Sequence, residues 1–280
     1  MRPEGVLLPF RFPGGKYYAL GRLHPFWETV VHDEYREPFV GGGTVFFAKT
    51  PAKHNWLNDI DKTLMTTYHV LADPELRSKL LSLLGSEVAS KERWREVKDI
   101  KPKNKLETAF RYYYLNRTSF SGKLSSPAWG YRPKRSLPPE RWHERIIPCG
   151  KKLEGVKLTC LDFGEVIKAE AMGSKALMYV DPPYYSPPKN KHYVNGFSND
   201  DHLRLCKLLS ETDFKFFLTY DDVRELRDMY SWANLYEIDF FYRVDNSNFA
   251  DKMRRRGREL VIANYKIPRG CKIDDFVASD

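Results

Sequence analysis

The segment Asp181-Pro182-Pro183-Tyr184 has the clearest chemical potential in this sequence of 280 residues. Each proline fixes its backbone φ angle and lacks an N–H donor, so the segment is stiff and its carbonyl groups have few local partners. The Asp181 carboxylate and the Pro182 carbonyl can each accept a hydrogen bond from an amino group, and Tyr184 can stack on a flat ring. The segment therefore predicts a clamp for the exocyclic amino group of a base.

This clamp suits the transfer of a methyl group to the amino nitrogen. The nitrogen lone pair is delocalised into the ring, and two acceptors on the N–H bonds favour a tetrahedral nitrogen that can attack a methyl group held in line. A base inside a duplex cannot reach such a site, so it must first be flipped out. An isolated tetrapeptide of this kind can also be a proline turn that ends a strand, with Asp181 as a cap.

A glycine-rich turn, Gly41–Gly43, follows a strand-like segment and indicates where a ligand approaches the backbone closely. Asp59 lies 18 positions after Gly41 (59 − 41 = 18), and an acidic residue about 20 positions beyond such glycines reaches ribose hydroxyls in nucleotide-binding folds. Asp59 is the candidate for this role, and Asp61 is the alternative. A complete Gly-x-Gly-x-x-Gly is absent, which disfavours a dinucleotide.

Two further segments suggest what else the ligand contains. Asp162 and the backbone N–H of Phe163 can read an adenine amino group and its adjacent ring nitrogen, although the pair can also be a simple turn. Lys16 follows Gly14-Gly15 and can pair with the carboxylate of an amino-acid tail, or it can be a solvated lysine. A phosphate-binding loop is excluded because Gly-x-x-x-x-Gly-Lys-Ser/Thr is absent.

Strands and helices alternate around these residues. Strand-like segments are expected at 35–40, 54–57, 156–161, 176–180 and 214–219, with a C-terminal antiparallel pair at 235–244 and 259–266. Helical spacing is found at 64–71, 75–84, 106–115 and 201–209, the last with cap residues at 199–201. This pattern predicts an open α/β sheet whose ligands lie beyond the carboxyl ends of the strands.

Basic and aromatic residues gather between the expected helices and the third strand. The net charge is +9, which suits a polyanionic partner. Residues 129–152 are predicted to contact DNA phosphates or guanine edges. A second basic cluster, 252–258, is expected in the loop of the C-terminal hairpin. The segment Tyr185–Phe197 is expected to close over a flipped nucleotide.

Composition narrows the class of protein. With 42% hydrophobic and 30% charged residues, the chain is typical of a folded globular protein. Its apolar runs are too short to cross a membrane, and residues 1–20 do not resemble a signal peptide, so a cytoplasmic location is expected. The four cysteines form no Cys-x-x-Cys pair, so no zinc site or other metal is expected. His192 and His202 lack a nucleophile partner, which leaves a Ser-His-Asp hydrolase without support.

With these segments taken together, the sequence resembles the Dam-like adenine-specific DNA methyltransferases of the α group. Eight motifs occur in the family order over nearly the whole chain: FPGGK at 12–16, EPFVGGGTVFF at 37–47, LNDID at 57–61, NRTSFSG at 116–122, Asp162-Phe163, Asp181–Tyr184, GFSNDDH at 196–202 and RELVIANY at 258–265. The resemblance implies a Rossmann-like sheet with a reversed last strand, S-adenosylmethionine as methyl donor, and an inserted helical target-recognition subdomain.

The resemblance also implies domain boundaries and roles. A catalytic domain would comprise 1–60 and 156–280, and a target-recognition subdomain 61–155. Asp181, Pro182 and Tyr184 would bind the target adenine. The residues that would bind the cofactor are Phe12, Lys16, Glu37, Phe39, Gly41, Gly43, Asp59, Asp162 and Phe163. The residues expected to contact DNA are Asn116, Arg117, Ser119, Tyr131, Arg132, Lys134, Arg135, Tyr185, Arg254, Arg255 and Arg256.

The expected activity is N6 methylation of adenine at a specific site in double-stranded DNA. Cytosine N4, an RNA adenine, a protein glutamine and a catalytically dead DNA-binding module are the alternatives. Asp181 in place of asparagine disfavours glutamine. The segment Asn116–Gly122 departs from the form found in relatives that methylate GATC, so another recognition sequence is expected. The protein is expected to come from a prokaryotic cell or a phage and to be a monomer or weak dimer. The sequence leaves open whether a restriction endonuclease accompanies it.

Overall fold

The computed structural model describes residues 5–185, 196–242 and 255–268. Its strands are β1 (Glu34–Glu37), β2 (His54–Asn58), β3 (Lys157–Thr159), β4 (Ala176–Val180), β5 (Lys215–Asp221), β6 (Asn234–Tyr242) and β7 (Arg255–Ala263). Its helices are η1 (Lys16–Ala19), α1 (Leu20–Glu28), α2 (Thr44–Ala48), α3 (Lys62–Ala72), α4 (Pro74–Gly85), α5 (Lys91–Asp99), α6 (Lys105–Thr118), η2 (Phe120–Gly122), η3 (Pro139–Arg141), α7 (His143–Leu153), α8 (Phe163–Lys168), α9 (Asn199–Glu211) and α10 (Arg224–Met229).

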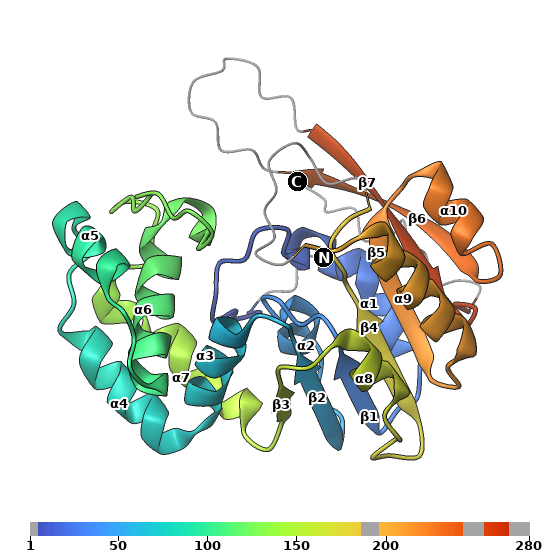
Figure 1. The fold of residues 1–280 in the computed structure, drawn as a ribbon, viewed down its shortest axis with the longest axis horizontal. Coiled ribbons are helices and arrows are strands. Elements are labelled where there is room, and N and C mark those ends of the chain that lie inside the picture. Colours follow the sequence, from blue (N-terminus) through green and yellow to red (C-terminus); the bar gives the residue numbers. More distant parts are fainter. Residues whose placement is uncertain (1–4, 186–195, 243–254, 269–280) are drawn as a thin grey trace.

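The seven strands form one mixed sheet in the order β3-β2-β1-β4-β5-β7-β6 (Figure 1). Strands β1 to β5 pair in parallel, whereas β7 runs antiparallel to both β5 and β6. The expected α/β sheet with a reversed last strand is therefore confirmed. The order of strands reverses between β1 and β4, and a ligand site is expected beyond the carboxyl ends of strands at such a switch point.

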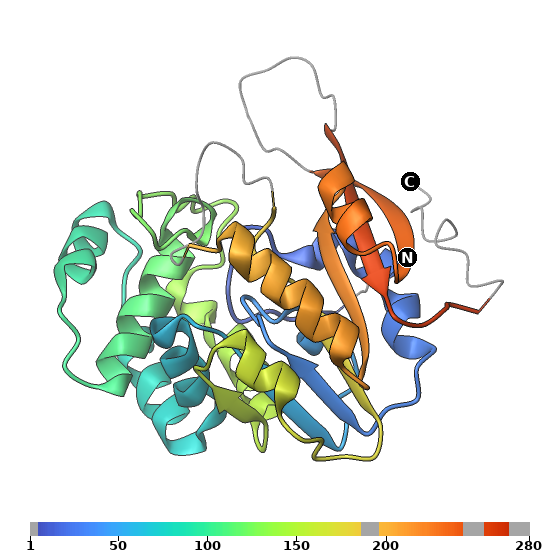
Figure 2. The same cartoon turned by 45° about the vertical axis from the view of Figure 1, so that its right-hand side comes forward.

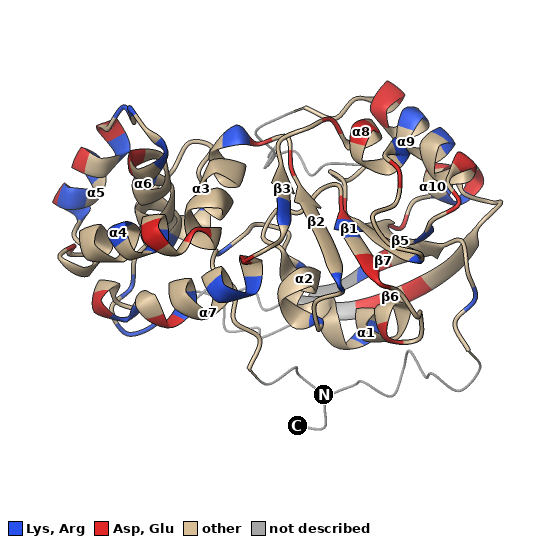
Figure 3. Ribbon diagram, turned by 90° about the horizontal axis from the view of Figure 1, so that it is seen from below, with Lys and Arg blue, Asp and Glu red and all other residues tan. Residues whose placement is uncertain are grey.

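Helices cover both faces of the sheet. Figure 3 shows α1 and α2 on one side and α8, α9 and α10 on the other, and Figure 2 shows α8 and α9 crossing over the strands. All five residues of β4 are buried, as expected for a central parallel strand covered on both faces. This burial fixes the end of β4, and with it the place of Asp181.

An ion pair at the amino ends of the strands ties β1 to α8. Arg36 Nε lies 2.5 Å from Glu34 Oε1, and both side chains are fully buried. The Arg36 guanidinium also donates to the carbonyls of Val166 and Ala169, each at 2.8 Å. The pair lies on the side of the molecule away from the switch point, so it serves the fold.

The helices α3 to α7 form a bundle beside the sheet, entered from β2 and left into β3 (Figure 1). Asp61 caps α3 by accepting from the backbone N–H groups of Thr63 and Leu64. Asn116, Tyr113 and Tyr114 of α6 are buried, although α6 lies outside the sheet. This inserted bundle corresponds to the region from which we predicted DNA recognition.

Several sequence predictions need correction. The strand expected at 35–40 ends at Glu37, because the chain turns toward the glycines. Helix α9 is capped by Ser198 rather than by 199–201. Residues 143–153, for which no helix was expected, form α7. Arg255 and Arg256 belong to β7 and pair with Tyr242 and Phe241 of β6, respectively, instead of lying in the hairpin loop. Arg254 and 186–195 of the expected closing loop lie outside the described residues.

In the part of the chain that the structure describes, no helix is long and apolar enough to cross a membrane. Over those residues, no cluster of three or more His, Cys, Asp or Glu side chains could hold a metal ion.

Candidate active site

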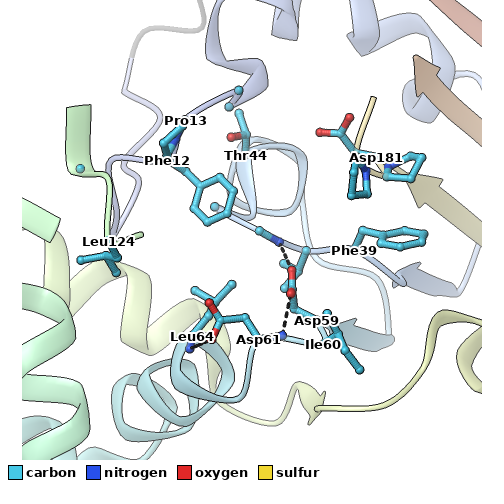
Figure 4. Close-up of a pocket in the computed structure, with 18 of the residues that line it drawn as sticks. Phe12, Pro13, Phe39, Thr44, Asp59, Ile60, Asp61, Leu64, Leu124 and Asp181 are labelled. Atoms are coloured by element: carbon cyan, nitrogen blue, oxygen red, sulfur yellow. Dashed lines mark hydrogen bonds between the residues drawn. The ribbon is translucent and has the colours of Figure 1, made fainter. Parts of the chain in front are cut away.

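A cavity of about 180 Å³ lies at the carboxyl ends of β1 and β4, where the strand order reverses (Figure 4). Segments far apart in the sequence line it: 12–16, 39–42, 59–61, 122–125, 181–183 and 196–197. Five of the predicted cofactor residues lie among these segments, namely Phe12, Lys16, Phe39, Gly41 and Asp59, together with Asp181 and Pro182 of the predicted clamp. The sheet thus brings the predicted methyl-donor segments beside the predicted amino-group clamp.

The glycine turn forms one wall of this cavity, and its backbone lies too close to neighbouring residues to admit side chains. A Cβ on Gly42 would lie 2.7 Å from Cβ of Phe12, and Gly41 and Gly43 have φ angles of 46° and 64°. These angles fall in the left-handed region that glycine adopts without strain. The hydroxyl of Tyr68 donates to the Gly41 carbonyl at 2.9 Å. The turn is therefore fixed against Phe12, whose ring faces the cavity in Figure 4.

Asp59 projects from the end of β2 to the floor of the cavity. Its carboxylate accepts hydrogen bonds from the backbone N–H groups of Gly41 at 2.9 Å and Asp61 at 3.0 Å (Figure 4). Burial raises the pKa of Asp59 to about 6, against the opposing effect of these backbone donors. Asp61 also lines the cavity, but its Oδ1 caps α3. The Asp61 carboxylate therefore caps α3, whereas the Asp59 carboxylate is hydrogen-bonded to the glycine turn.

Asp181 follows β4 and is held by two side chains from other elements. Lys16 Nζ lies 2.7 Å and 2.9 Å from its two oxygens, and Thr219 of β5 donates to Oδ1 at 2.7 Å. Lys16 is only 5% exposed. Burial by itself would lower the pKa of Lys16, but the charges of Asp181 and Glu259 outweigh it and keep the pKa above its usual value. Lys16 thus lies on the predicted base clamp, where we had expected a partner for the cofactor carboxylate.

Tyr184 lies beside this ion pair. The Lys16 Nζ is 5.1 Å from the centroid of the Tyr184 ring, and the Tyr184 hydroxyl donates to the Glu259 carboxylate on β7. The next residue, Tyr185, donates its backbone N–H to Asp221 at 2.9 Å and packs edge-on against His202. These contacts fix the Tyr184 side chain and the backbone that follows it, so the Tyr184 ring has a defined position beside Lys16 and Asp181.

Three predicted cofactor residues lie behind the cavity wall. Glu37 is 1% exposed and accepts from the Tyr35 hydroxyl at 2.6 Å and the Phe46 N–H at 2.9 Å. Burial raises the pKa of Glu37 to about 8. Phe163 is buried and stacks on Phe39 with ring centroids 5.2 Å apart.

The third of these residues, Asp162, caps α8 and forms two hydrogen bonds with Arg204, at 2.7 Å and 2.8 Å. These bonds hold the pKa of the Asp162 carboxyl below its usual value, with Arg204 as the main cause. Its oxygens are thus engaged outside the cavity, and the residue shapes the α8 terminus.

The predicted DNA contacts divide into buried and exposed groups. Asn116 and Ser119 are buried at 1% and 0% exposure. The Asn116 amide bonds the backbone of Arg11 and the Gly122 carbonyl, and Ser119 accepts from the indole of Trp94. Such placements hold the N-terminal segment and the η2 turn together and do not fit direct contact with DNA.

The exposed group lies in the loop after η2. Arg132, Lys134 and Arg135 are exposed, and Tyr131 packs against Trp129. These residues keep the placement that a surface contact with DNA requires. For Arg255 and Arg256 the structure describes the backbone alone.

Arg117 is a cation with little compensation. Its Nε is buried and has no hydrogen-bond partner among the described residues. Burial and the nearby charge of Arg145 lower the pKa of Arg117, and burial together with Arg117 lowers that of Arg11. Arg117 of α6 is therefore close enough to repel both Arg11 of the N-terminal segment and Arg145 of α7.

Sequence reasoning missed three site residues. Thr219 and Glu259 lie within apolar strands, and only their neighbours across the sheet reveal their role. Phe120 is 59% exposed at the η2 turn, where its N–H donates to the Ala128 carbonyl at 2.7 Å. Its signal was an aromatic residue inside the otherwise polar segment 116–122.

Comparison with known proteins adds independent findings. The model of the D12 class N6 adenine-specific DNA methyltransferases matches residues 12–244. The chain is 28% identical to the type II methyltransferase M.MjaIII of Methanocaldococcus jannaschii, over 92% of this chain and 99% of that protein. It is 26% identical to the type II methyltransferase M1.LlaDCHI of Lactococcus lactis subsp. cremoris, over 92% and 96%. It is 24% identical to the type II methyltransferase M.CviBI of Paramecium bursaria Chlorella virus NC1A, over 91% and 98%.

Proposed function

The chain belongs to the D12 class of N6 adenine-specific DNA methyltransferases, and on that premise we propose how its residues perform the reaction and which form of DNA it modifies. The family uses S-adenosylmethionine, whose sulfonium supplies an electrophilic methyl group. The cavity residues fit this cofactor. A half-buried carboxylate, Asp59, faces the cavity beside a glycine turn in which Gly41 and Gly42 lie too close to Phe12 for a side chain. The aromatic rings of Phe12 and Phe39 can enclose a nucleoside.

Within this proposal, Asp59 binds the ribose hydroxyls, and Phe12, Phe39 and the Gly41–Gly43 turn shape the nucleoside pocket. Glu37 and Phe163 support the pocket from behind, through Phe46 and Phe39. The bundle from 61 to 155 serves target recognition, and 1–60 with 156–280 serve catalysis.

The observation that carries the catalytic proposal is the hydrogen bonding of Asp181. A carboxylate offers about four acceptor positions. Lys16 occupies one on each oxygen and Thr219 a second on Oδ1, which leaves one on Oδ2. That position can accept an N–H of adenine while the Pro182 carbonyl accepts the other. Lys16 and Thr219 act as positioning residues that hold the Asp181 carboxylate with this acceptor position directed at the base, and Tyr184 stacks on the flipped base.

The substrate we propose is a specific site in double-stranded DNA. The exposed basic loop with Arg132, Lys134 and Arg135 would follow the phosphates, and Phe120 would contact the bases beside the flipped adenine. A DNA phosphate near Arg117 would compensate its charge, because a half-buried guanidinium whose buried Nε has no partner among the described residues is unfavourable. Replacing Arg117 with Gln is expected to weaken binding to all sequences and to reduce the salt dependence by about one phosphate contact.

The catalytic proposal is tested by incubating the protein with radiolabelled S-adenosylmethionine and plasmid DNA, followed by digestion and identification of the modified base. N6-methyladenine is expected. Replacing Asp181 with Ala should abolish transfer and leave cofactor binding nearly unchanged. Transfer retained by this variant would disprove the proposed role of Asp181, and a product other than N6-methyladenine would disprove the choice of atom.

The names of the relatives suggest the biological setting. We propose that the chain is a type II methyltransferase paired with a restriction endonuclease, that it acts as a monomer or weak dimer, and that it works in the cytoplasm of a prokaryotic cell, encoded by that cell or by a phage. Sequencing of modified positions in treated DNA gives the recognition site, and sedimentation measures the oligomeric state. Methylation of every adenine without sequence preference would contradict this setting.

A further inference from the structure

A carboxylate on the reversed strand reaches the predicted base clamp from the opposite side. Glu259 of β7 is 2% exposed. Its Oε1 accepts the hydrogen bond from the Tyr184 hydroxyl and lies 4.0 Å from Lys16 Nζ. Its Oε2 is buried and has no hydrogen-bond partner among the described residues. A buried carboxylate with one oxygen unpaired requires an explanation, because burial without full hydrogen bonding is unfavourable.

Stability alone does not explain why a charged side chain occupies position 259. Burial raises the pKa of Glu259 to about 7, Lys16 lowers it, and Asp181 raises it again. The residues on either side in β7, Arg258 and Leu260, pair with Asp239 and Glu237 across β6, in a regular antiparallel ladder that any side chain permits. An apolar residue would suit this buried position of the sheet better, so the acid has a cost that the fold does not require.

What the carboxylate does is hold two residues of the site. Without it, the Tyr184 hydroxyl would lose its partner, and the ring would be free to rotate about its side-chain torsions. Lys16 would lose its second anionic neighbour, and Asp181 would be its sole counterion among the described residues. The contact also links β7 to the end of β4, two segments 75 positions apart in the sequence.

We propose that Glu259 is a positioning residue for methyl transfer, which fixes the Tyr184 ring for stacking on the flipped adenine and holds Lys16 against Asp181. The inference rests on the proposed function, since it assigns Tyr184 to the target base. Glu259 itself does not touch the reacting atoms. Its effect is transmitted through the Tyr184 hydroxyl and, at longer range, through the Lys16 ammonium.

The experiment compares Glu259→Gln, Tyr184→Phe and the double variant in single-turnover methyl transfer to a duplex that contains the recognition site. Gln keeps the size of Glu259 and resembles its protonated form, so the fold is retained. Each single variant should slow transfer roughly 10- to 100-fold, the range for losing a hydrogen bond to a charged group. The double variant should be little slower than either, because both weaken one contact: Glu259→Gln removes the charge of the acceptor, and Tyr184→Phe removes the donor.

Two readouts separate positioning from a general loss of structure. The dissociation constant for S-adenosylmethionine should change less than twofold in both single variants. A duplex with 2-aminopurine at the target position should still bind, but its fluorescence should differ from that of the wild-type complex because the flipped base is no longer stacked firmly. Glu237→Gln is the matched control, since Glu237 lies on β6 and is 53% exposed, and it should behave as the wild type.

Transfer by Glu259→Gln within twofold of the wild-type rate would overturn the inference, and so would losses that add in the double variant. Either result leaves the proposed function intact as long as the wild type forms N6-methyladenine. If the wild type forms none, it is the proposed function that fails. Should Glu259→Gln melt at a much lower temperature, Tyr184→Phe breaks the same contact without altering β7, and its rate and fluorescence decide the question.

Discussion

The two acidic residues that follow β2 provide the sharpest test of the cofactor site. The sequence left Asp59 and Asp61 as alternatives for binding ribose. In the structure Asp59 accepts from Gly41 and Asp61 within the cavity wall, whereas Asp61 caps α3. We therefore compare Asp59→Ala with Asp61→Ala, two truncations of the same size two residues apart.

The expected magnitudes differ in kind. A hydrogen bond to a charged group contributes about 1.5–3 kcal/mol. Loss of two such bonds to the ribose hydroxyls, at the lower end of that range, costs about 3 kcal/mol and weakens cofactor binding roughly 100-fold. Asp61→Ala instead removes a helix cap, which is worth about 1 kcal/mol of unfolding free energy and about 2–4 °C in melting temperature.

The assay is calorimetric titration of each variant with S-adenosylmethionine, followed by thermal melting without the cofactor. The pKa of about 6 at Asp59 adds a pH test. Because ribose binding uses the ionised carboxylate, wild-type affinity should be full above pH 7 and decline as the pH falls through 6. The reasoning is refuted if Asp59→Ala binds within threefold of the wild type, or if Asp61→Ala is the weaker binder.

Three further predictions concern buried charges. Lys16→Met leaves Asp181 without its cation, so the rate of single-turnover transfer should fall more than about 100-fold, while cofactor affinity changes less than threefold. Equal losses in transfer rate and cofactor affinity would instead support a contact between Lys16 and the cofactor carboxylate. Arg36→Met leaves the buried Glu34 without its cation and should lower the free energy of unfolding by about 3–5 kcal/mol in denaturant titration, with unchanged activity per folded molecule. A loss smaller than about 1 kcal/mol would contradict the role of Arg36 in stabilising the fold. Burial raises the pKa of Glu37 to about 8 in the folded state from 4.5, so the native state binds more protons than the unfolded state between these pH values, and the free energy of unfolding should fall as the pH rises from 4.5 to 8. The melting temperature of Glu37→Gln should therefore depend less on pH than that of the wild type. An equally steep dependence in this variant would contradict the assignment to Glu37.

Motifs that are local in sequence were predictable. Asp181-Pro182-Pro183-Tyr184 follows β4 as expected, because an apolar strand that is buried on both faces is recognisable from its residues alone. The glycine turn and Asp59 were found for the same reason, since turn geometry and spacing are encoded within the one unit of β1, the turn, α2 and β2. The expected alternation of strands and helices likewise gave the parallel part of the sheet.

Contacts across the sheet were not predictable. Lys16 and Asp181 are 165 positions apart, and nothing local shows that a lysine behind a glycine turn reaches the end of β4. Burial of Asn116 and Ser119 depends on how the N-terminal segment crosses α6, which periodicity does not reveal. Helix α7 was missed because Pro148 lies inside it, and α5 because Trp94 and Val97 are its only buried residues.

The helical bundle leaves the sheet at the end of β2 and returns at β3, and these two strands are paired, with Asn58 opposite Thr159. The two points of attachment are therefore neighbours. Residues can be gained, lost or exchanged between them without changing the spacing of the strands that carry Asp59 and Asp181. On the proposed assignment of the bundle to target recognition, sequence preference can evolve by replacement of this one continuous segment. Chimaeras joined at these two points would then inherit the target site of the donor and the chemistry of the host.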